Sequence, residues 1–103
     1  MSTLAERLDW IMREGNLTLA DLQRWFGRSY HTVRGWTLGH QIGGAPLDAA
    51  FVKSQIDQLE NSIRKKKHFP VPRLSKTERI EYLAKARTQL RSALPTTPGR
   101  HRY

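Results

Sequence analysis

The chain has 103 residues, of which 38% are hydrophobic, and its formal net charge is +9. This length allows one domain, or one small domain with an appendage, and the low hydrophobic content favours oligomerisation as a supplement to the core. The absence of cysteine excludes disulfides, thiol catalysis and cysteine-ligated zinc. No stretch reads as a membrane span or secretory signal, so we expect a cytoplasmic protein, bacterial or, if viral, in the host cytoplasm.

The basic residues are concentrated in the second half. Residues 1–51 contain five basic and five acidic residues, whereas residues 52–103 contain thirteen basic and four acidic residues. Such an excess favours a polyanionic partner, with a solvated basic face that keeps the protein soluble as the alternative. A membrane surface fits less well, because no helical pattern pairs a broad apolar face with this charge.

A first helix is predicted from a capping box formed by Thr3 and Glu6. Its apolar residues at helical spacing are Leu4, Leu8, Ile11 and Met12. The helix is expected to end near Arg13 or Glu14, before Gly15-Asn16. The pattern does not decide whether Trp10 joins the core. We expect this helix to have a structural role, bracing the elements that follow.

The next segment, 19–39, has the pattern of two short helices joined by a glycine. The first of them, capped by Thr18, has an inner face made of Leu22, Trp25 and Phe26. Gly27 follows, at a point where the left-handed backbone conformation has a low energy only for glycine. These features predict a sharp turn after the first helix.

The second helix is predicted from about Ser29, its cap, to Leu38. Val33 and Trp36 are three residues apart and point back toward the first helix. The outer face is left with Tyr30, His31, Arg34 and Thr37, whose side chains suit base edges and phosphates better than a core. The segment is therefore interpreted as a helix-turn-helix.

The spacing of Leu22, Phe26-Gly27, Val33 and Trp36 resembles the helix-turn-helix of Cro- and phage-repressor-type (XRE-like) DNA-binding proteins. The exit through Gly39 toward Pro46 and a new helix is similar as well. The resemblance implies that this chain binds double-stranded DNA sequence-specifically, with the start of the second helix in the major groove. Gly35 occupies a site that often reads a base in that family, so base reading falls on other residues of this helix.

We expect two sets of DNA contacts, of which the resemblance implies the base-edge set and the phosphate contacts of Thr18 and Ser29. The base-edge set is Tyr30, His31 and Arg34, of which Arg34 suits guanine O6 and N7. The expected phosphate contacts, drawn from helix caps, flanking loops and basic residues, are Thr18, Arg28, Ser29, Thr37, His40, Arg64, Lys65, Lys66 and Lys67. A single exposed tyrosine or histidine usually has no binding role, so the prediction depends on Tyr30, His31 and Arg34 lying on one face of the helix.

After a glycine-rich loop, residues 47–67 predict a long helix. Its apolar seam, spaced by four, three and four residues, is Val52, Ile56, Leu59 and Ile63. It ends in four consecutive cations, Arg64 to Lys67, which suit both a helix C-terminus and a phosphate.

Two prolines interrupt residues 68–73, and a capping box at Ser75 and Glu78 opens a last helix to about Leu94. Its apolar positions Ile80, Leu83, Leu90 and Leu94 follow heptad spacing, and Arg87 interrupts them. We expect this helix to form an antiparallel hairpin with the previous one, with a dimer through the same seams as the rival.

The sequence thus predicts an all-α fold: a helix-turn-helix domain at 1–46, a basic two-helix hairpin at 47–94 that stabilises or oligomerises it, and a flexible basic tail at 95–103. The four histidines have no metal-ligand spacing, and no nucleotide loop or nucleophile motif is present. We therefore expect no enzyme, metal, cofactor or small-molecule substrate.

The function expected is that of a small phage or bacterial transcriptional regulator, a homo-oligomer with a dimer favoured. One alternative is a phage small terminase subunit, which also resembles a helix-turn-helix followed by oligomerising helices and delivers DNA to a packaging motor. Another is a protein- or RNA-interaction module whose helix-turn-helix no longer reads DNA. The zero net charge of residues 1–51 favours that last alternative.

Overall fold

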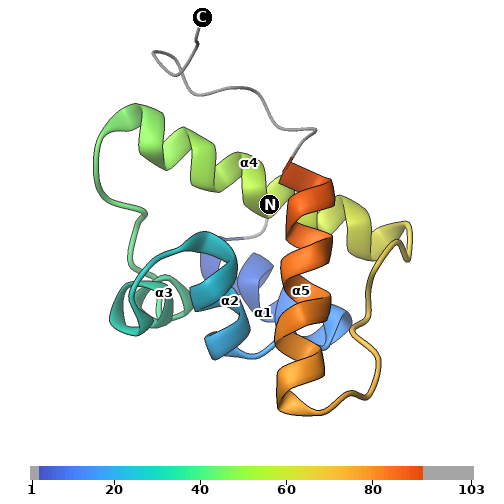
Figure 1. The fold of residues 1–103 in the computed structure, drawn as a ribbon. Coiled ribbons are helices and arrows are strands. Elements are labelled where there is room, and N and C mark those ends of the chain that lie inside the picture. The colour runs from blue at the N-terminus through green and yellow to red at the C-terminus, as the bar shows by residue number, and fades with distance from the viewer. Residues whose placement is uncertain (1–2, 92–103) are drawn as a thin grey trace, which may run out of the picture.

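The structure is a computed structural model that describes residues 3–91. Over these residues its regular secondary structure is all helical, with α1 (Leu4–Gly15), α2 (Leu19–Phe26), α3 (Tyr30–Thr37), α4 (Pro46–Arg64) and α5 (Lys76–Arg91). Figure 1 shows α1, α2 and α3 grouped below the long helix α4, with α5 standing in front of them and crossing α4 near its own C-terminal end. No helix within this range is long and apolar enough to cross a bilayer. The predicted tail lies outside the described residues.

Helix α1 begins at the predicted capping box, in which Thr3 and Glu6 each accept a hydrogen bond from the backbone N–H of the other. It ends later than predicted, because Gly15 is still helical and Asn16 adopts the left-handed conformation, with φ 56°. Gly15 is buried, and a Cβ there would lie 2.9 Å from Ile63 Cδ1. The glycine therefore serves close packing, and asparagine, which tolerates the left-handed region, ends the helix.

All five helices contribute to a single hydrophobic core. The largest fully buried side chains in it are Leu8, Ile11, Leu22, Ile56, Leu59, Val33 and Val52. The predicted seam of α4 is buried as expected, and Trp10, which the sequence left undecided, packs partly buried at the core's edge. Segments 1–46 and 47–94 therefore share one core rather than each having its own.

Helix α4 ends at Arg64, three residues before the predicted end. Lys65 is the cap, and the chain then turns through positive φ values of 57° at Lys66 and 74° at His68. The three lysines thus lie in the turn that follows the helix. The capping box that opens α5 forms as predicted, because Ser75 and Glu78 exchange hydrogen bonds of 3.1 and 3.2 Å.

The predicted antiparallel hairpin is wrong in its packing, because α5 packs along α2 and only its end reaches α4. Near that end, Gln58 Nε2 donates to the Leu90 carbonyl at 2.6 Å. The linker causes the difference, since buried Phe69 packs edge-on against Trp25, with ring centroids 5.9 Å apart. This anchoring carries the start of α5 to α2, and Ile80 remains 36% exposed at its predicted core position.

Candidate nucleic-acid interface

Helices α2 and α3 are joined by the short turn that the sequence predicts. Gly27 has φ 67° and ψ 34°, and its N–H donates to the Gln23 carbonyl at 2.9 Å. Ser29 caps α3, since its Oγ accepts from the Thr32 N–H at 3.2 Å. Both helices have eight residues, so α3 is about 12 Å long.

The inner face of α3 is held firmly against the rest of the molecule. Val33 is fully buried and Trp36 is 2% exposed. The Trp36 ring meets Phe26 of α2 edge-on, with centroids 5.8 Å apart. Helix α3 also packs on α1. This packing leaves the opposite side of α3 free of core contacts.

The outer side of α3 carries the three predicted base-edge residues. Tyr30 is 44% exposed, and His31 and Arg34 are exposed as well. The Tyr30 and His31 rings touch edge to face, 5.9 Å between centroids. Arg34 makes no ion pair within residues 3–91. The structure therefore brings these three side chains together on one solvent-facing surface.

The local charge of this region is positive although residues 1–51 are neutral in sum. No acidic residue lies between Asp21 and Asp48, a stretch that contains Arg24, Arg28 and Arg34. Asp21 itself is 3% exposed and forms ion pairs with Arg24 and Arg79. The neutral half therefore contains a cationic segment around α3.

Four of the predicted phosphate residues, Thr18, Arg28, Ser29 and Thr37, belong to α2 and α3, to their caps or to the turn between them. Thr18 and Ser29 hydroxyls accept from backbone N–H groups of the helices they cap, and Thr37 Oγ1 donates to the Arg34 carbonyl at 2.6 Å. Arg28 is exposed in the turn. A hydroxyl engaged in one such bond keeps further hydrogen-bonding capacity.

Gly35 lies beneath the side chain of His40. The glycine is buried, and a Cβ on it would lie 2.9 Å from His40 Nδ1. His40 also donates its backbone N–H to the Gly35 carbonyl at 2.9 Å. Gly35 therefore faces inward at the C-terminal end of α3, where the absence of a side chain lets His40 pack against it.

Of the predicted phosphate residues at the end of α4, Arg64 lines the same surface hollow as Thr37 of α3. Figure 1 shows α3 at the left of the molecule and the C-terminal end of α4 at the right. Arg64 stacks over the Trp10 ring, 5.3 Å from its centroid. Lys65, Lys66 and Lys67 are exposed. The turn that carries the three lysines thus lies apart from α3 in this view, whereas Arg64 shares a hollow with it.

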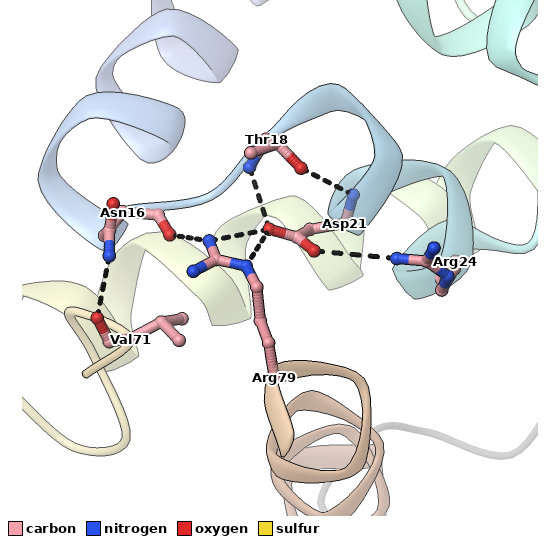
Figure 2. A network of polar contacts seen from close by, with 6 residues as sticks. All are labelled: Asn16, Thr18, Asp21, Arg24, Val71 and Arg79. Carbon is pink, nitrogen blue, oxygen red and sulfur yellow. Dashed lines mark hydrogen bonds and ion pairs between the residues drawn. The ribbon is translucent and has the colours of Figure 1, made fainter. Parts of the chain in front are cut away.

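A network that the sequence did not reveal holds the start of α2 (Figure 2). Asp21 accepts from the Thr18 N–H at 2.9 Å and from Arg79 Nε, also at 2.9 Å, and Arg79 bonds the Asn16 carbonyl as well. Asn16 in turn donates to the Val71 carbonyl at 2.8 Å. The sequence indicated only the local parts of this network, which are the end of the first helix near Asn16 and the start of α2 at its cap Thr18, with the acidic Asp21 in the first turn.

The electrostatics of Asp21 follow from this network. Burial raises the pKa of its carboxyl group, but the hydrogen bonds from Arg79 and Thr18 outweigh burial and hold the pKa below its usual value. Asp21 is therefore ionised at neutral pH and structural in role.

Residues 3–91 contain no cluster of three or more histidine or acidic side chains that could hold a metal ion. No protein-family model, curated protein or solved structure matches this chain. The features of the molecule that bear on its function are therefore the geometry of α2 and α3 and the distribution of charge.

Proposed function

We propose that this chain binds double-stranded DNA sequence-specifically by placing α3 in the major groove, and that it acts as a small phage or bacterial transcriptional regulator. The observation that carries the proposal is the common solvent-facing surface of Tyr30, His31 and Arg34 on a helix whose other side is locked by Trp36. A major groove about 12 Å wide admits one helix.

The chemistry of this surface supports the proposal. Arg34 has no carboxylate partner within residues 3–91, so its guanidinium is free to donate two hydrogen bonds to a guanine edge. Tyr30 and His31 add donors, acceptors and ring faces. Arg24 and Arg28 supply positive charge near by, where phosphates flank a groove-bound helix.

Selection of bound duplexes from a random pool tests this function. The proposal expects a defined motif, bound at least about 10³-fold more tightly than random duplex at physiological salt. Recovery of duplexes without a common motif would contradict it. Arg34→Ala, checked for an unchanged melting temperature, should lose the enrichment.

Native mass measured on the same sample separates the proposed regulator from a packaging protein. We expect a monomer or a dimer, and for a dimer the selected motif should be a palindrome with half-sites about 34–36 Å apart. A ring of many copies would favour the terminase-like function and would contradict the regulator role, while leaving DNA recognition by α3 in place.

A further inference from the structure

A narrow crevice lies between α2 and α5, away from the outer face of α3. It encloses about 100 Å³ and is lined by Asp21, Arg24, Trp25, Ile80, Leu83, Ala84 and Arg87. Its surface is mostly apolar, supplied by one indole ring and the aliphatic side chains of α5. An open apolar crevice that remains between two packed helices is available to a ligand.

The one carboxylate that lines this crevice, Asp21, is contacted by two guanidinium groups, and the lining contains a further arginine, Arg87. Arg79 contacts Asp21 Oδ2 at 2.7 Å, and Arg24 Nη1 lies 3.7 Å from Asp21 Oδ1. Arg87 has no carboxylate within ion-pair distance in the described part of the chain. The crevice therefore carries excess positive charge beside an apolar floor.

Arg87 is the least compensated of these cations. It is half-buried, and its Nε donates to the Trp25 carbonyl at 2.7 Å, which directs its remaining N–H groups toward other acceptors. Burial lowers the pKa of its guanidinium, and the nearby Arg91 lowers it further. A half-buried cation without an anionic partner is electrostatically unfavourable, and an anion that binds it is favoured for that reason.

We propose that the crevice binds a small carboxylate, whose apolar part of about one six-membered ring lies against Trp25 and Leu83 while its carboxylate accepts from Arg87 and Arg24. The volume is of the order that accommodates a single benzene-sized ring. A planar guanidinium matches a carboxylate better than it matches a spherical anion.

This inference does not depend on DNA binding, because none of the outer residues of α3 lines the crevice. It adds a bound small molecule to a chain whose sequence predicted no small-molecule substrate. The proposal is one of binding alone, because the one carboxylate in the lining, Asp21, is already engaged by Thr18, Arg79 and Arg24.

Titration of the full-length protein with benzoate, followed by NMR, tests the proposal. We expect shifts of the Trp25 indole N–H and the Arg87 Nε–H, with a Kd of ~1 mM for a ligand of this size. Benzamide lacks the charge and acetate lacks the ring, so each should bind at least about tenfold more weakly.

Two variants address the two halves of the site, with melting temperature as the check on folding. Arg87→Met keeps the aliphatic stem but removes the charge, and Ala84→Phe fills the crevice from its exposed side while leaving Arg87 in place. Each should weaken benzoate binding at least about tenfold. Lys85→Met removes a neighbouring exposed charge that does not line the crevice, and should change nothing.

Four results would overturn the proposal. One is benzoate shifts spread over exposed basic residues such as Lys65 to Lys67 rather than confined to the crevice. Another is equal binding of benzamide and benzoate. The third is loss of binding in Lys85→Met as large as in Arg87→Met. Unaltered benzoate binding in Ala84→Phe would exclude the crevice as the site in the same way.

Discussion

Arg79 of α5 holds Asp21 of α2 through two nitrogens that share one oxygen, with Nε 2.9 Å and Nη2 2.7 Å from Asp21 Oδ2. The two residues are 58 positions apart in the chain. The same guanidinium bonds the Asn16 carbonyl, where α1 has just ended. One side chain of α5 therefore fixes the corner at which α1 leads into α2, so α5 takes part in positioning α2.

Asp21→Asn should lower the free energy of unfolding at pH 7 by about 2 kcal/mol, because Arg79 loses its charged partner in a mostly buried setting. The pKa of Asp21 is lower in the folded state, so its contribution to stability is complete above the unfolded value, about 3.9, and is lost as the pH falls through the folded value. Urea denaturation from pH 7 to pH 2.5 measures both effects.

The slope of stability against pH below about pH 4 should therefore be smaller in Asp21→Asn than in the unmodified protein. Some slope should remain, because the backbone hydrogen bonds at Thr3 and Ser75 also lower the pKa values of Glu6 and Glu78. Identical slopes in the two proteins would show that Asp21 is not held by Arg79 in solution.

Gly27→Ala should lower the free energy of unfolding by about 1 kcal/mol. The residue has φ 67°, and a Cβ there would meet nothing within 4 Å, so the loss comes from the left-handed backbone alone. Gly43→Ala is the matched control, since Gly43 also has open space around it but no positive φ. It should be neutral or slightly stabilising. Equal losses at both sites, measured by urea denaturation, would contradict this explanation of the turn.

Arg34→Ala and His31→Ala should each weaken binding to the selected DNA motif by about 1–3 kcal/mol and affect random duplex much less. The reason is that their side chains face solvent on α3 and carry no structural contact to another helix. Fluorescence anisotropy with motif and scrambled duplexes measures the difference. Equal losses on the two duplexes would remove these residues as base readers.

Replacing Lys65, Lys66 and Lys67 together by glutamine should weaken binding to motif and random duplexes alike and leave their ratio unchanged. These exposed residues belong to the turn after α4 and not to α3, so they can add only sequence-independent phosphate contacts. The slope of log K against log salt should fall by up to about one per lysine that meets a phosphate. An unchanged slope would place the cluster away from DNA.

The local features of this fold were determined by the sequence. Capping boxes at Thr3, Thr18 and Ser75 start three helices where side chain and backbone exchange bonds three residues apart. The glycine turn and the inward faces of α2 and α3 follow the 3.6-residue period. Each of these depends on interactions within a few residues, which a linear pattern displays directly.

Only the tertiary structure decided where α5 packs and which cations are paired. Arg79 and Arg87 are both basic residues of one weakly amphipathic helix, yet one meets Asp21 and the other meets the Trp25 carbonyl. No periodicity within α5 distinguishes them, because both partners lie on α2, about sixty residues away. Contacts at that separation depend on where the linker, with Phe69 buried against Trp25, places α5, so the path of the chain and not the residue type selects the partner.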